Sequence, residues 1–149
     1  MSPHELVVFR LCNVEGFCKK GFNEKLKKYC VRDLSIDNEE FDYPFSTVVP
    51  DAYKFPTPSE GEPMKVMVAE VEDSSLLTED KIYRYYNIWE MLDSEGVNFD
   101  VLIYNRYGRH TDTLSNEYFE NIQLEENCEE QLSHSTGIEA NYRVHNQTD

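Results

Sequence analysis

Three acidic residues stand at the ends of apolar segments, where carboxylates are able to act together. Asp51 follows the apolar residues 48–50, and Glu70 and Glu72 close the segment Met64–Glu72. In a strand, residues two positions apart project from one face, so Glu70 and Glu72 form a pair. Converging carboxylates hold Mg²⁺, which polarises a phosphate and lowers the pKa of a bound water. These acids therefore indicate metal-dependent phosphodiester hydrolysis.

The elements that position these acids lie on both sides of Glu72. Met64–Glu72 is rich in β-branched residues and predicts a buried strand. Leu77–Glu95 has helical spacing with Thr78 as its N-cap, and Phe99–Tyr104 predicts a second short strand. Strand, helix and strand in this order need a crossover connection, which favours a sheet covered by its helix.

The segment upstream of this unit predicts antiparallel strands. Phe41–Val49 and Tyr53–Phe55 have the composition of strands, and the turn-rich segment Pro56–Pro63 leads into the next strand. If the strand that ends at Asp51 pairs with Met64–Glu72 as a hairpin, Asp51 and Glu70 meet at its end.

Flanking segments complete the predicted organisation. Glu5–Val14 is apolar, but it is too short for its periodicity to separate a strand from a helix. A short helix is expected over Asn23–Val31, with its first residue as the N-cap, and another over Asn116–Leu124. The acidic segment Glu125–Asp149 is expected to be a flexible tail, so a single domain is assigned to residues 1–124.

The motif Pro50-Asp51, followed nineteen residues later by Glu70-Val71-Glu72 and then by an amphipathic helix and a strand, resembles the PD-(D/E)xK nuclease superfamily. The resemblance covers about Asn23–Tyr104. It implies the restriction-endonuclease-like α/β (α+β) fold, a mixed central sheet in αβββαβ order flanked by helices. It also implies that Asp51 and Glu70 bind Mg²⁺ or Mn²⁺, with Glu24 on the first helix as a further metal ligand.

Glu72 stands where the superfamily motif has lysine, and some members supply that lysine from elsewhere. Lys81 is the candidate replacement, because it lies in the first turn of the expected helix near the acids. A cation there opposes the helix dipole, and an acidic site nearby offsets this cost. The predicted catalytic residues are Asp51, Glu70, Glu72 and Lys81.

Two cationic segments fit a nucleic-acid partner, with DNA favoured over RNA. Lys19–Arg32 has six bases against one acid, and the loop Arg106–His110 is basic and aromatic. Such side chains contact backbone phosphates or stack on bases. The residues expected to make these contacts are Lys19, Lys20, Lys27, Lys28, Arg106, Arg109 and His110. Each segment, taken alone, fits an ordinary solvated surface better than a nucleic-acid contact.

The net charge of −15 opposes simple nucleic-acid binding, because attraction to phosphates needs cationic surface. Residues 116–149 hold eight acids and one base. Two alternatives therefore stay open. One is a non-enzymatic acidic protein of the immunity or DNA-mimic type, which binds a basic protein partner through complementary charge. The other is a nuclease-like scaffold that has lost catalysis, an interpretation that rests on Glu72.

Composition sets the broad class of the protein. Hydrophobic residues make up 40% of the 149 residues and aromatic residues 13%, which argues against disorder and fits one domain with a core. No apolar run approaches the roughly 20 residues of a membrane span, and the first ten residues do not resemble a signal peptide. The four cysteines lack C-x-x-C spacing. We expect a cytoplasmic protein with free thiols and no membrane partner.

Overall fold

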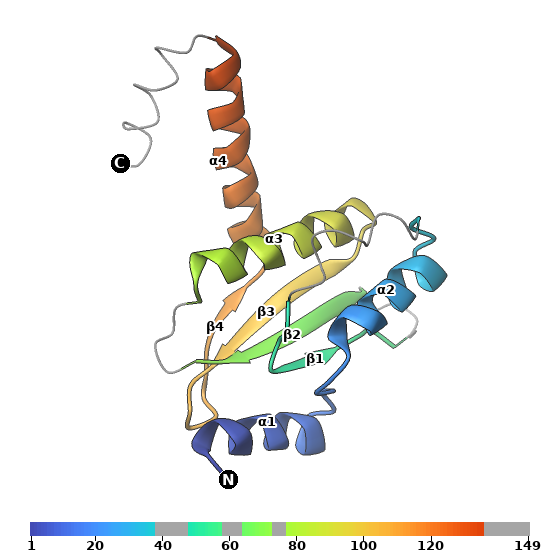
Figure 1. Ribbon diagram of the computed structural model, residues 1–149, viewed down its shortest axis with the longest axis vertical. Helices are drawn as coiled ribbons and strands as arrows, with labels where there is room; N and C mark the ends of the chain where they lie inside the picture. The colour runs from blue at the N-terminus through green and yellow to red at the C-terminus, as the bar shows by residue number, and fades with distance from the viewer. Residues whose placement is uncertain (38–47, 58–63, 73–76, 136–149) are drawn as a thin grey trace. The chain divides into compact units, whose positions relative to one another are not determined.

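The computed structural model of this chain describes residues 1–37, 48–57, 64–72 and 77–135, and within them it is a mixed α/β fold (Figure 1). The chain divides into two compact units, Met1–Asn116 and Glu117–Asp149, and the first unit contains the sheet. In chain order, the described elements are α1 (Pro3–Val14), α2 (Phe22–Asp33), β1 (Ala52–Lys54), β2 (Lys65–Val71), α3 (Glu79–Ser94), β3 (Asn98–Tyr104), β4 (His110–Leu114) and α4 (Asn116–Ser135).

The four described strands form one open, mixed sheet in the order β1-β2-β3-β4. β1 is antiparallel to β2, β2 is parallel to β3, and β3 is antiparallel to β4. Because α3 connects the parallel strands β2 and β3, the predicted strand–helix–strand crossover is confirmed. An antiparallel partner of β2 is found next to Asp51, but it is β1, which begins after Asp51 instead of ending at it, with Ala52 opposite Ala69.

Helix α3 begins where the sequence predicts and covers one face of the sheet. The Thr78 Oγ1 atom accepts the backbone N–H of Lys81 at 3.3 Å, and acidic residues in the first turn suit the positive end of the helix. The ring centroid of Tyr85 lies 5.9 Å from that of Phe99 on β3. Figure 1 shows α2 on the same side of the sheet, next to β1. The buried residues of α3 are Tyr85, Tyr86, Ile88, Trp89 and Leu92.

Helix α1 packs against the opposite face of the sheet, so the unit has three layers. Because side chains alternate along a strand, the odd-numbered residues of β2 point away from α3. Ser2 caps the helix, its Oγ atom accepting the backbone N–H of Glu5 at 3.2 Å. The sequence left Glu5–Val14 open between a strand and a helix, and the structure shows a helix. The buried residues of this layer are Val7, Val8, Leu11, Phe17, Ala52, Ala69, Val71 and Tyr104.

The start of α2 differs from the prediction. Gly21, not Asn23, is the N-cap, and its φ of +80° lies in the left-handed region that favours glycine. The Asn23 side chain has another role: its Nδ2 atom donates to the backbone oxygen of Val48 at 3.0 Å. This bond ties α2 to the chain that leads into Asp51.

Other differences concern strands and the C-terminal part. Residues 41–47 of the strand predicted over Phe41–Val49 lie outside the described residues, and the last two residues of that segment are not in a strand. The final helix continues to Ser135, so it extends beyond its predicted end at Leu124 and includes Glu125–Ser135. Residues 136–149 lie outside the described residues.

The expectations on membrane spans and cysteines have clear outcomes. None of the helices in the described ranges combines the length and the apolar character needed to cross a bilayer. The four cysteines are free thiols, as predicted.

Candidate active site

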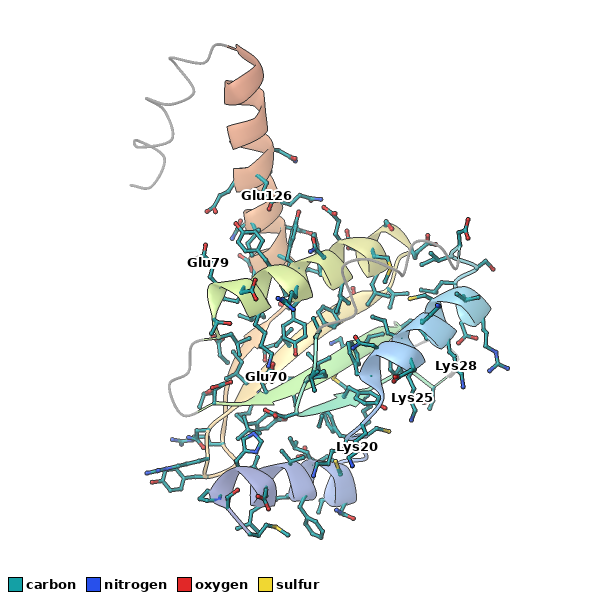
Figure 2. The ribbon with its side chains drawn as sticks, viewed as in Figure 1. Lys20, Lys25, Lys28, Glu70, Glu79 and Glu126 are labelled. Atoms are coloured by element: carbon teal, nitrogen blue, oxygen red, sulfur yellow. The ribbon has the colours of Figure 1, made fainter. Side chains whose placement is uncertain are left out.

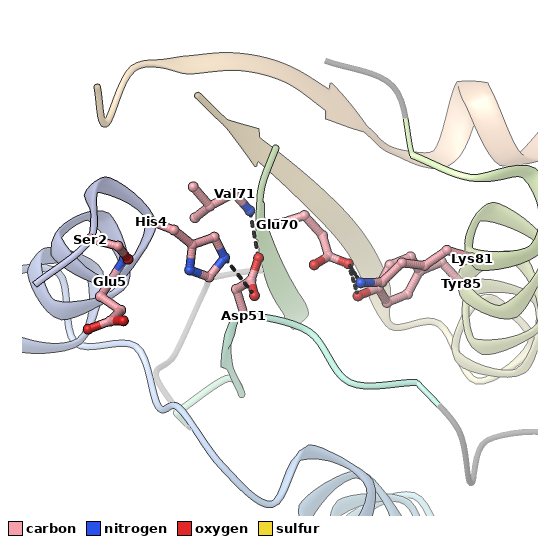
Figure 3. Close-up of polar contacts among 8 residues, drawn as sticks. All are labelled: Ser2, His4, Glu5, Asp51, Glu70, Val71, Lys81 and Tyr85. Atoms are coloured by element: carbon pink, nitrogen blue, oxygen red, sulfur yellow. Dashed lines mark hydrogen bonds and ion pairs between the residues drawn. The ribbon is translucent and has the colours of Figure 1, made fainter. Parts of the chain in front are cut away.

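Asp51 and Glu70, here called the acid pair, lie at the end of the sheet where β1 begins and β2 ends. Asp51 directly precedes β1, and its backbone N–H donates to the oxygen of Ala69 at 3.1 Å, which sets it beside Glu70 on the next strand. Figure 3 shows the Asp51 carboxylate turned toward α1 and the Glu70 carboxylate turned toward α3. The two acids are therefore neighbours across the hairpin, each held by a different helix.

Asp51 is fixed through both of its carboxylate oxygens. The backbone N–H of Val71 donates to Oδ2 at 2.8 Å, and His4 Nε2 lies 3.1 Å from Oδ1. The Asp51 side chain remains 23% exposed, so its carboxylate is positioned and still reachable from solvent. His4 was missed by sequence reasoning, because no motif links a residue at the start of α1 with an acid on a distant strand.

Glu70 is fully buried and has both of its partners on one oxygen. Lys81 Nζ lies 2.5 Å from Oε2, and the hydroxyl of Tyr85 donates to the same oxygen at 2.8 Å (Figure 3). Within the described residues, the other oxygen, Oε1, is buried and has no hydrogen-bond partner. A buried acceptor without a partner is costly and marks a place for an ordered water or an ion. Tyr85 was missed as a site residue, because its place among the buried residues of α3 gives no signal of a polar role.

Burial governs the ionisation of these side chains. It raises the pKa of Glu70 to about 7 from the usual 4.5, with Lys81 and Tyr85 lowering it and the charge of Asp51 raising it. Burial also raises the pKa of Tyr85 well above its usual value, and the charge of Glu70 adds to this rise. The two acids thus influence each other electrostatically, and Glu70 exchanges its proton near neutral pH.

The raised pKa of Glu70 predicts a pH-dependent stability. Its folded value of about 7 exceeds the ordinary 4.5, so the folded chain holds more protons between these values. The stabilisation is complete below the lower value and is lost as pH rises through the upper one. Relative to the Glu70→Gln variant, the wild-type free energy of unfolding should fall by about 3 kcal/mol from pH 4 to pH 8. Urea unfolding of both proteins at the two pH values measures this, and a constant difference contradicts it.

The other predicted acids are not part of one cluster with the acid pair. Glu72 directly follows β2, where its backbone N–H donates to the oxygen of Tyr104 at 2.8 Å, and its side chain is half-buried. Glu24 is exposed on α2. In the part of the chain that the structure describes, no group of three or more His, Cys, Asp or Glu side chains is placed to hold a metal ion. Glu24 is therefore not brought to the acid pair.

The first predicted cationic segment lies around α2. Lys19 and Lys20 are exposed just before this helix, Lys28 is exposed on it, and Lys27 is half-buried. Figure 2 shows Lys25 and Lys28 on α2 and Lys20 before its start, all apart from Glu70. These lysines form a cationic surface at the β1 side of the sheet, separate from the acid pair.

The second cationic segment lies at the same end of the sheet as the acid pair. Because β3 is parallel to β2, with Tyr104 opposite Val71, the turn after β3 lies close to Glu70. Arg106, Arg109 and His110 are all exposed. The His110 ring lies 5.3 Å from the Tyr104 ring, and its Nε2 is 2.7 Å from Thr113 Oγ1. The structure thus places a cationic turn next to two acids.

Comparison of this chain with protein-family models, with curated proteins and with solved structures gives no match. The functional argument therefore rests on the geometry and chemistry of the acid pair and its surroundings.

Proposed function

We propose that this protein hydrolyses phosphodiester bonds of nucleic acid with one divalent cation, Mg²⁺ or Mn²⁺, at the acid pair. The observation that carries the proposal is the buried, unpartnered Oε1 of Glu70 on the strand next to Asp51, with the Lys81 ammonium at the same carboxylate. The order β1, β2, α3, β3 with a parallel crossover supports the restriction-endonuclease-like arrangement that the motif implies.

The donor set fits magnesium. Mg²⁺ takes oxygen ligands and is usually bound by one or two carboxylates, the remaining positions being filled by waters and substrate phosphates. Asp51 and Glu70 would supply two carboxylates, so a third acid is not required. Because the Asp51 carboxylate faces α1 and the Glu70 carboxylate faces α3 in this structure, one of the two side chains must turn for both to bind the same ion. Bound there, the ion would polarise the scissile phosphate and lower the pKa of a water ligand.

The chain's own residues would then position the reacting groups. The backbone N–H of Val71 and His4 fix the Asp51 carboxylate. Lys81 takes the place of the motif lysine that Glu72 replaces, and its ammonium stabilises the negative charge that develops on the phosphate. The cationic turn after β3 contacts the flanking phosphates, which carry no sequence information.

A second function, binding of nucleic acid without cleavage, is favoured by a specific observation. Glu70 is fully buried and its Oε2 atom is occupied by Lys81 and Tyr85, so the carboxylate must give up a partner or use Oε1 alone to bind an ion. Glu72 at the position of the motif lysine also favours binding without cleavage.

A cleavage assay separates the two functions. Labelled single-stranded DNA, duplex DNA and RNA are incubated with the full chain in Mg²⁺, in Mn²⁺ and in EDTA. The proposal predicts cleavage of at least one substrate with either metal and none in EDTA. Binding of the same substrates without cleavage under every condition contradicts hydrolysis and leaves binding as the function.

A further inference from the structure

Helix α1 and the turn between β3 and β4 line an open surface pocket of about 480 Å³ at the acid end of the sheet. This volume lies in the range of small-ligand sites. The wall from α1 is mostly apolar, and the wall from the turn is cationic and aromatic. The residues that line the pocket are Pro3, Leu6, Val7, Arg10, Arg106, Tyr107 and Gly108.

One wall of the pocket continues into a residue that contacts Asp51, and the other continues from a residue that is hydrogen-bonded to the end of β2. On one side, Pro3 is followed by His4, whose Nε2 lies 3.1 Å from the Asp51 carboxylate. On the other side, the turn follows Tyr104, whose backbone oxygen accepts the N–H of Glu72 at 2.8 Å. The pocket therefore lies at the same end of the sheet as the acid pair.

The shape of the turn is fixed and closely packed against α1. The Asn105 Oδ1 atom accepts the backbone N–H groups of Tyr107 at 2.9 Å and Arg109 at 3.0 Å. Gly108 has a φ of +82°, which favours glycine, and a Cβ atom at this position would lie 3.9 Å from Arg10 Nη1. The backbone of the turn is thus fixed, and Arg10 of α1 lies near it.

These side chains have the chemistry of nucleotide recognition. The Tyr107 ring is 77% exposed, and the guanidinium of Arg106 lies 5.2 Å from its centroid. Aromatic rings stack on unpaired bases, and arginine binds phosphate with directed hydrogen bonds. Arg10 adds a second guanidinium at the pocket, and the segment Asn105–His110 contains no acid.

We propose that this pocket binds one unpaired nucleotide of a nucleic-acid strand, with its base on Tyr107 and a phosphate on Arg10 and Arg106. The inference rests on the proposed function and names its substrate class: a single strand, or a strand with unpaired bases beside the scissile bond. A base inside a duplex is stacked on both faces and must be unpaired before it enters a pocket.

The test measures binding in EDTA, so that cleavage does not contribute. Fluorescence anisotropy of a short fluorescein-labelled DNA strand is compared with that of the same sequence as a duplex. The single strand should bind about tenfold more tightly. Tyr107→Ala should weaken binding of the single strand about tenfold, whereas Tyr107→Phe should retain it. Arg10→Ala should weaken binding and reduce the slope of log affinity against log salt by about one unit.

Arg84→Ala is the matched control, because Arg84 pairs with Asp80 on α3 and does not line the pocket. It should bind as the wild type does. Equal affinity for single strand and duplex, or wild-type binding by both Arg10→Ala and Tyr107→Ala, overturns the inference. If the wild-type protein cleaves no substrate but binds the single strand in EDTA through the pocket, only the proposed hydrolysis is contradicted. Failure of the hydrolysis proposal can therefore be told apart from failure of the pocket proposal.

Discussion

Replacing Asp51 with asparagine is expected to lower metal-dependent cleavage on the order of a thousandfold while the fold is kept. The substitution removes one of the two carboxylates of the acid pair and its negative charge. An asparagine oxygen still accepts the backbone N–H of Val71, which now donates to Asp51 Oδ2 at 2.8 Å. The initial cleavage rate at saturating Mg²⁺, measured beside the thermal unfolding midpoint, checks both parts of the expectation.

Asp100→Asn is the matched control for this variant. Asp100 lies on β3, and its carboxylate is 3.1 Å from Lys65 Nζ. The Asp100→Asn variant therefore also loses an ion pair of an aspartate, but one that does not involve the acid pair. Its cleavage rate should stay within about twofold of wild type, because this ion pair lies toward the other end of β2 and β3 from the acid pair and contacts none of its residues. Wild-type cleavage by Asp51→Asn, with a native unfolding midpoint, contradicts the role of Asp51.

Replacing Lys81 with methionine is expected to affect stability and cleavage together. Methionine keeps the length of the side chain and removes the ammonium that lies 2.5 Å from the buried Glu70 carboxylate. At pH 8 the carboxylate must then be buried without its cation or take up a proton, and the free energy of unfolding should fall by about 2 kcal/mol. Cleavage should fall about a hundredfold, since the charge on the phosphate loses a positive partner.

The loss of stability in Lys81→Met should depend on pH. Near pH 5, Glu70 is mostly protonated in both proteins, because its pKa in the folded wild type is about 7. The difference in unfolding free energy should therefore shrink to a few tenths of a kcal/mol. Urea unfolding at pH 5 and pH 8 measures it, and the double variant with Glu70→Gln tests the coupling. An equal loss at both pH values shows that lost packing, not the ion pair, is responsible.

The strand–helix–strand segment β2, α3 and β3 could be predicted from the sequence because its signals are local and strong. The apolar run before Glu72 and the stripe of α3 bury enough surface to define a strand and a helix, and Thr78 marks where the helix begins. Once β1 and β2 pair as a hairpin, their register sets Asp51 beside Glu70. The proximity of Lys81 follows from its place in the first turn of α3.

The remaining features depend on contacts that a linear pattern does not carry. β4 has one buried residue, Leu114, so it lacks the apolar alternation by which strands are recognised. His4 and Tyr85 reach the acids from opposite layers of the sheet, a relation fixed only by tertiary packing. Arg10 joins the turn after β3 for the same reason. Gly21 caps α2 through backbone conformation, and no side-chain signal competes with that of Asn23 in the sequence.

The central claim is that Asp51 and Glu70 share one divalent cation. Isothermal titration of Mn²⁺ into the full chain and into Asp51→Asn at pH 8, where Glu70 is mostly ionised, tests it most directly. We predict one ion bound by the wild-type protein and affinity at least tenfold weaker in the variant. Equal affinity in the two proteins, or no heat of binding in either, contradicts a metal site at the acid pair.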